Sequence, residues 1–228
     1  MVISMFLAHL VGDYILQWDS LAAWKGRELK GVLAHGMIVT LVTFLFILPF
    51  EPLWIEGALF ICTAHILIDA SQLYIKPPIA PLLRFGLDQL AHFTVITIAL
   101  VWGGYVEVGN VAGQLTAVLQ NDRVWIILLG YAFITMPVWV IIKFLAYGLV
   151  KGAPPDFGGT NKYVGIMERL LIATFVAMGQ FLLVPLVTLP RLVVEWPSLK
   201  KGETAVYLTE LLASIYMAVI IGLLLTII

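Results

Sequence analysis

The chain has 228 residues, of which 61% are hydrophobic and only 12% are charged. Soluble domains carry roughly a quarter charged residues, so this composition excludes an ordinary soluble domain and predicts an integral protein of the lipid bilayer. The formal net charge of −1 gives no indication of nucleic-acid binding, and the single cysteine, Cys62, excludes a disulfide within the chain.

Long apolar segments recur along the whole chain. A transmembrane helix needs about 20 apolar residues. The segments that meet or approach this length are 2–17, 32–50, 54–75, 87–106, 124–149, 165–189 and 205–228. They predict an all-α, polytopic membrane helical bundle of about seven transmembrane helices, or six plus a re-entrant segment because the first is short.

We expect one integral membrane domain, 1–228, with a four-helix half at 1–106 and a three-helix half at 124–228. Within the second half, Pro137 lies in the middle of an apolar segment. Proline lacks a backbone N–H and clashes with the preceding helical turn, so a kink is expected there.

Lysine and arginine in the short loops predict the orientation of the chain. One side carries Lys25, Arg27, Lys30, Lys76, Arg84, Lys151 and Lys162. The other side carries Arg123, Arg191, Lys200 and Lys201. The positive-inside rule places the richer side in the cytoplasm.

Histidine and aspartate form the most informative pattern. All four histidines lie in the first 92 residues, and three of them stand four residues from an aspartate. The seven residues are the pairs His9–Asp13, His65–Asp69 and Asp88–His92, and the lone His35. Residues four apart share one face of a helix. Because neighbouring helices run antiparallel, all seven side chains are expected at one depth, within one leaflet.

Ionisable groups inside a bilayer are costly and usually mark a functional site. Imidazole nitrogen and carboxylate oxygen together suit Zn²⁺, Fe²⁺ or Mn²⁺. We therefore predict a divalent metal site held by His9, His65, His92 and one or more of Asp13, Asp69 and Asp88, with the lone His35 as a further candidate ligand. Seven exceeds the need of one tetrahedral ion, so some would orient the ligating imidazoles, or two metals would bind. The alternative without metal is a bundle core held by salt bridges and hydrogen bonds.

The leading functional prediction is a metal-dependent hydrolase of a lipid-like or amphiphilic substrate, since a bound metal activates water. Asp88 or Glu168 would act as general base, and Arg169 would meet a negative substrate group. One alternative is a transporter or proton-relay protein whose path is lined by the same cluster. Another is a non-catalytic subunit or assembly factor of a larger membrane complex.

Short motifs stand in a fixed order along the chain. They are His9-x3-Asp13-x3-Gln17, Lys25, Leu33-x-His35, His65-x3-Asp69 and Asp88-Gln89-x2-His92, followed by Gly165-Ile-Met-Glu168-Arg169-Leu and Gly179-Gln180. Together they resemble the bacterial membrane family called domain of unknown function 3307, over nearly the whole chain. That family tends to have a lysine soon after the H-x3-D aspartate, whereas here Lys76 lies seven residues beyond it.

This resemblance implies a multi-pass protein of the bacterial inner (cell) membrane and brings no settled activity with it. The His/Asp pattern is also similar to that of bacterial inner-membrane proteins described as metal-dependent hydrolases. That likeness supports the prediction of a metal site. For the prediction of a hydrolytic reaction it is only an analogy between families.

Overall fold

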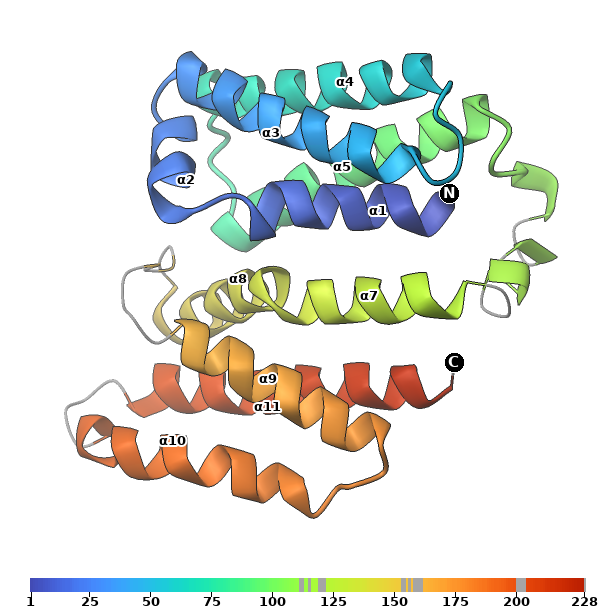
Figure 1. The fold of residues 1–228 in the computed structure, drawn as a ribbon. Helices are drawn as coiled ribbons and strands as arrows, with labels where there is room; N and C mark the ends of the chain where they lie inside the picture. Colours follow the sequence, from blue (N-terminus) through green and yellow to red (C-terminus); the bar gives the residue numbers. More distant parts are fainter. Residues whose placement is uncertain are drawn as a thin grey trace. The chain divides into compact units, whose positions relative to one another are not determined.

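The computed structural model describes residues 1–110, 113–114, 116–118, 122–152, 155, 157, 162–199 and 204–227, without the side chains of 194–199. Lys200 and Lys201, two of the predicted loop charges, lie outside the described residues. Every regular element in the described part of the chain is helical (Figure 1), which agrees with the all-α prediction.

The chain falls into two compact units. The N-terminal unit comprises Met1–Ile79 and Leu83–Ala132, and the C-terminal unit comprises Ala80–Leu82 and Phe133–Ile228. Each is described by itself below, and the predicted single domain stays a prediction.

The described residues contain fewer candidate membrane spans than the sequence predicts. The helices that are long and apolar enough are α3 (Leu29–Ile47), α4 (Ile55–Tyr74), α5 (Pro81–Trp102) and α11 (Thr204–Thr226). The bent pair α7 (Arg123–Ile134) and α8 (Met136–Ala146), with the extension of α8 to Lys151, makes a fifth if it is counted as one span. A membrane helical bundle is therefore plausible, and seven spans are not confirmed.

The first predicted span, 2–17, is a short helix with a widened end. It consists of α1 (Val2–Leu10) and a π-helical turn at Val11–Ile15. In that turn the amide of Leu16 donates to the carbonyl of Val11 at 2.8 Å, a bond over five residues. The two pieces together rise only about 21 Å. A hydrocarbon core is about 30 Å thick, so they are too short for a full span.

The predicted segment 165–189 is two helices, α9 (Lys162–Ala177) and α10 (Leu183–Leu199). Gly179 between them has a φ of 73°. Its amide donates to the carbonyl of Val176 at 2.9 Å, and the amide of Gln180 donates to that of Phe175 at 2.7 Å. This pair of bonds is the glycine C-cap that ends many helices. Hydropathy does not detect a helix end of this kind. The sequence analysis therefore predicted the two helices as one segment.

The kink predicted at Pro137 is present. α7 ends at Ile134, α8 begins at Met136, and the two are bent by 40°. Arg169 of α9 is buried beside the break. Its Nε donates to the carbonyl of Ile134 at 2.8 Å, and its Nη2 donates to that of Thr135 at 2.9 Å. The guanidinium thus gives hydrogen bonds to backbone carbonyls that the bend exposes.

The N-terminal unit has an apolar core at one end of its main helices. α3 packs against α1, α2 (Asp19–Lys25) and α4. The core residues are Met5, Ile47, Ala58, Ile61, Ile96, Ala99 and Leu100. They lie toward the start of α1 and α4 and toward the end of α3 and α5, while the predicted site residues lie from the middle of these helices toward the opposite ends. Each of these helices therefore has one apolar end and one end that carries His or Asp.

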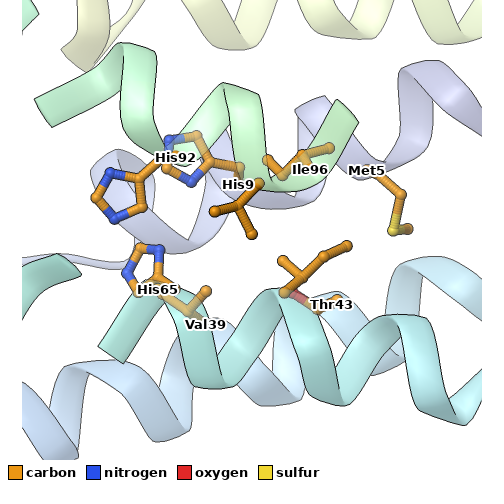
Figure 2. A pocket seen from close by; sticks show the side chains of 9 residues that line it. Met5, His9, Val39, Thr43, His65, His92 and Ile96 are labelled. Carbon is orange, nitrogen blue, oxygen red and sulfur yellow. The ribbon is translucent and has the colours of Figure 1, made fainter. Parts of the chain in front are cut away.

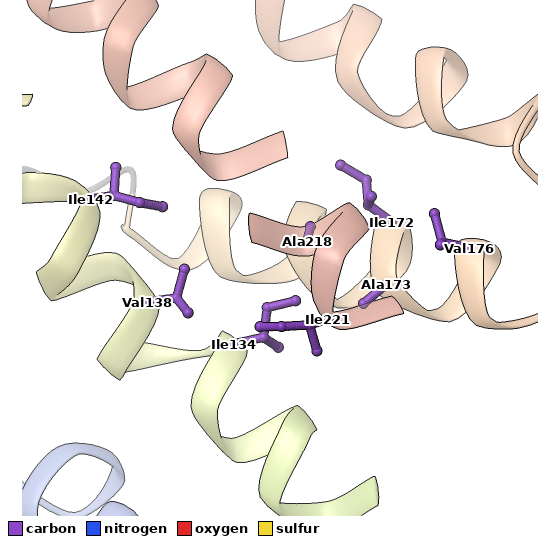
Figure 3. Close-up of a cluster of buried hydrophobic side chains, with 8 residues drawn as sticks. All are labelled: Ile134, Val138, Ile142, Ile172, Ala173, Val176, Ala218 and Ile221. Carbon is purple, nitrogen blue, oxygen red and sulfur yellow. The ribbon is translucent and has the colours of Figure 1, made fainter. Parts of the chain in front are cut away.

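The C-terminal unit has a separate apolar core. Figure 3 shows side chains from the α7–α8 junction, α8, α9 and α11 that converge. They are Ile134, Val138, Ile142, Ile172, Ala173, Val176, Ala218 and Ile221. Lys143 of α8 and Glu210 of α11 form an ion pair at 2.9 Å in the same unit.

A small residue allows α3 and α4 to approach closely. A Cβ added at Gly36 would overlap side-chain atoms of Ile66. We expect Gly36→Ala to lower the free energy of unfolding by about 1–3 kcal/mol, since overpacked helix contacts must shift. Thermal unfolding in detergent micelles measures the loss. Gly86→Ala on α5, where nothing lies within 4 Å, is the matched control and should be neutral or slightly stabilising. Equal effects of the two changes would contradict the close contact.

Candidate metal centre

Histidines and aspartates from four helical segments meet in the N-terminal unit. The contributors are α1 and its π-helical turn with His9 and Asp13, α3 with His35, α4 with His65 and Asp69, and α5 with Asp88 and His92. All are buried except Asp88, which is half-buried. The structure therefore brings together every one of the seven residues whose common depth the sequence predicts.

Four of these residues surround one point. Asp13 Oδ1 lies 3.0 Å from His35 Nε2 and 3.8 Å from His65 Nε2. Asp69 Oδ2 lies 3.6 and 3.3 Å from the same two nitrogens, which are 3.3 Å apart. A tetrahedron with metal–ligand bonds of about 2.0–2.1 Å has edges of about 3.3 Å. The five separations scatter around that value, so the donor set fits a tetrahedral divalent ion.

A second group shares Asp69 with the first. Asp69, Asp88 and His92 also offer ligand atoms that lie within 4.8 Å of one another. His92 Nε2 is 3.9 Å from Asp69 Oδ1, and His92 Nδ1 is 3.8 Å from Asp88 Oδ1. His9 belongs to neither group. Its ring stacks on that of His92, with centroids 5.2 Å apart and planes at 27°.

A lysine joins the cluster from α2. Lys25 Nζ lies 2.9 Å from Asp69 Oδ2 and 3.4 Å from Asp13 Oδ1. Burial by itself would lower the pKa of Lys25, but the carboxylates of Asp13 and Asp69 outweigh it and hold the pKa above its ordinary value. Lys25 was not among the predicted site residues. Its place in the ordered run of motifs was the one signal that could have found it.

Amide side chains hold the carboxylates in position. Gln89 Nε2 donates to Asp88 Oδ2 at 3.1 Å and to Asp13 Oδ2 at 3.5 Å, and Gln89 Oε1 lies 3.3 Å from His9 Nε2. Gln72 Nε2 donates to Asp88 Oδ1 at 3.3 Å. Such partners fix the orientation of ligating groups. The sequence analysis did not assign this role to either glutamine.

Glu168 and Arg169 have partners within the C-terminal unit. Glu168 Oε2 accepts a hydrogen bond from Arg191 at 2.8 Å, and both Glu168 and Arg169 are buried. Besides its bonds at the α7–α8 break, Arg169 donates to Ser214 Oγ at 3.3 Å. These contacts are structural, and the predicted catalytic roles of the two residues stay predictions.

A small cavity adjoins the histidines. Figure 2 shows the rings of His9, His65 and His92 at one end and Met5 and Thr43 at the other. The remaining lining residues are Val39, Ile61, Val95 and Ile96. Its volume of about 10 Å³ is close to the space that one water needs. The cavity therefore has room for a water beside the imidazoles.

Comparison with known proteins gives one match. The family described as "Protein of unknown function (DUF3307)" matches residues 1–118, which hold the whole His/Asp cluster. No curated protein and no solved structure matches significantly. The matched range ends before Gly165 and Gly179, so the resemblance seen in those later motifs stays a prediction, as does the likeness to metal-dependent hydrolases.

Removal of the lysine should destabilise the protein most when no metal is bound. We expect Lys25→Met to lower the melting temperature of chelator-treated protein, because Asp13 and Asp69 would lose their shared cation. A saturating divalent ion should reduce the deficit. Thermal unfolding with and without metal measures both effects, and Lys30→Met, at an exposed position of α3, is the control. If a divalent ion leaves the loss of melting temperature in Lys25→Met unchanged, the assignment of a cation site between Asp13 and Asp69 is contradicted.

Proposed function

Since the chain belongs to the DUF3307 family of proteins of unknown function, we propose its function from its geometry: an integral membrane hydrolase that depends on a divalent metal. The observation that carries the proposal is the set formed by Asp13, His35, His65 and Asp69, whose ligand atoms have tetrahedral spacing in a buried site. An ion held there supplies Lewis acidity and lowers the pKa of a bound water toward neutrality.

The charge of the cluster supports the same proposal. Ionised Asp13, Asp69 and Asp88 exceed the single ammonium of Lys25 by two negative charges. Unbalanced buried charge is strongly destabilising. One divalent ion balances this cluster. Two imidazole nitrogens with two carboxylate oxygens suit Zn²⁺, Fe²⁺ or Mn²⁺, in keeping with the sequence prediction.

The position of the cluster indicates an amphiphilic substrate. His35 lies six residues after Leu29, where α3 begins, so it is about 9 Å from the end of that helix. A group at this depth meets the polar part of a lipid-like molecule while the apolar part stays in the bilayer. Asp88 has the most exposed carboxylate of the three, with 19% of its side chain accessible. We assign Asp88 to the side of the cluster that meets the substrate.

A metal-free ionic core is the second candidate function. It is favoured by Lys25, whose ammonium already bridges Asp13 and Asp69. In this alternative the cluster only holds the helices together, as in a non-catalytic subunit of a membrane complex. Metal binding and turnover separate the two candidates.

Metal analysis tests the site. Purified protein should retain a stoichiometric divalent ion, and His35→Ala and Asp69→Asn should each weaken its binding by at least about tenfold, since each removes a ligand. Glu56→Gln, at an exposed position of α4, is the matched control and should leave the metal content unchanged. Protein that takes up no ion from Zn²⁺, Fe²⁺ or Mn²⁺ solutions would favour the ionic core.

Turnover tests the reaction. Full-length protein in lipid vesicles should hydrolyse at least one member of a panel of amphiphilic esters, amides and phosphoesters. Chelation should stop turnover, and metal should restore it. Asp88→Asn should abolish turnover and leave the melting temperature nearly unchanged, because the amide keeps the volume of the side chain at a position that is partly accessible to solvent. Hydrolysis that survives both chelation and Asp88→Asn would refute the mechanism.

A further inference from the structure

The two oxygens of Asp69 face different partners. Oδ2 lies 3.3 and 3.6 Å from His65 Nε2 and His35 Nε2. Oδ1 lies 3.9 Å from His92 Nε2, in the other group. A carboxylate in this position can give one oxygen to each of two ions. Asp69 is the only residue that belongs to both metal-binding groups found among the described residues.

His92 has a lone pair available for an ion. Its Nδ1 lies 2.9 Å from the backbone carbonyl of Asp88. A carbonyl oxygen only accepts, so Nδ1 carries the proton and Nε2 carries the lone pair. Nε2 is buried, since the residue is only 2% exposed, and it has no hydrogen-bond partner among the residues that the structure describes. An unpaired buried nitrogen costs free energy, and a cation would remove that cost.

We propose that a second divalent cation binds to Asp69 Oδ1 and His92 Nε2, with Asp69 as the bridge between two ions. The carboxylate of Asp88, which lies 3.8 Å from His92 Nδ1, would shift toward Nε2 to become the third ligand. This inference rests on the proposed function, because it takes the ion at Asp13, His35, His65 and Asp69 as given. Asp88 then acts as a ligand of the second ion instead of as the general base that the sequence predicts.

The second position differs from the first in openness. It has three protein ligands, and one of them, Asp88, is partly accessible to solvent. Gln72 and Gln89 hold the two oxygens of that carboxylate. An ion with open coordination positions exchanges more readily and has room for a substrate oxygen. We therefore assign weaker binding to the second ion than to the first.

Charge balance then indicates the class of substrate. One divalent ion and the ammonium of Lys25 together neutralise the three carboxylates. A second divalent ion therefore leaves two positive charges in buried surroundings. An oxyanion at the open positions balances them. Pairs of divalent ions typically clamp the oxygens of a phosphoryl group. The two-ion site thus fits a phosphoester of an amphiphilic alcohol better than a neutral ester or amide.

Binding of Mn²⁺ to the full-length protein in micelles tests the second site. We expect two ions per chain and an electron paramagnetic resonance spectrum of two coupled ions, since one carboxylate joins them. His92→Gln should bind one ion and give the spectrum of isolated Mn²⁺. Glu56→Gln, at an exposed position of α4 and outside both groups, is the matched control and should keep two coupled ions. If His92→Gln fails to fold, Asp88→Asn takes its place with the same expected loss.

The outcomes separate this inference from the proposed function. One ion in the wild type and in His92→Gln alike overturns the second site and leaves a hydrolase with one metal. No ion in either protein overturns both. Inorganic phosphate should tighten binding of the second Mn²⁺ without tightening that of the first. Equal binding with and without phosphate overturns the assignment of a phosphoester.

Discussion

The need to balance buried charge governs the N-terminal unit. Asp13, Asp69 and Asp88 lie in an apolar protein where an unpaired carboxylate costs several kcal/mol. Each therefore has partners from another segment: Lys25 from α2, and amide groups from Gln72 and Gln89. All of these partners must be in place in the folded protein, because removal of one leaves a carboxylate without its compensating group. The packing of α2 on α3 is thus part of the same electrostatic requirement as the site itself.

Much of the site was predictable because helix geometry is regular. A spacing of four residues puts His65 and Asp69 on one face, and antiparallel neighbours bring the end of one helix beside the start of the next. These two facts predict that residues as far apart as His9 and His92 meet. They need no side-chain coordinates. The convergence in the structure follows from them.

The division of the seven residues into two ligand groups that share Asp69 was not predictable. Whether Asp69 faces one histidine or three depends on rotamers, and the sequence gives only the helix face. Lys25 reaches the cluster through a long side chain from the short helix α2, in a stretch that the sequence analysis treated as a loop. His9 has the same four-residue spacing as His65 but stacks on a ring and joins neither ligand group. Spacing alone does not distinguish these outcomes.

The number of membrane spans was predicted less well than the convergence of the His and Asp side chains, for a related reason. Hydropathy averages over about 20 residues, whereas the features that end helices are single residues. Pro137 was recognised because its missing N–H is a property of the residue type. Gly179 was not, because glycine occurs in many settings and only its φ of 73° shows that it ends α9.

The position of Arg169 has a consequence for biogenesis. Its guanidinium is accommodated by the carbonyls of Ile134 and Thr135, which exist as acceptors only once α7 and α8 have formed their bend. An arginine without such acceptors is expensive in lipid. Synthesis runs from the N-terminus, so the acceptors leave the ribosome before the donor. The order of the chain thus makes the acceptors on α7 and α8 available before α9 is synthesised, and α9 is expected to pack late, onto a bend that has already formed.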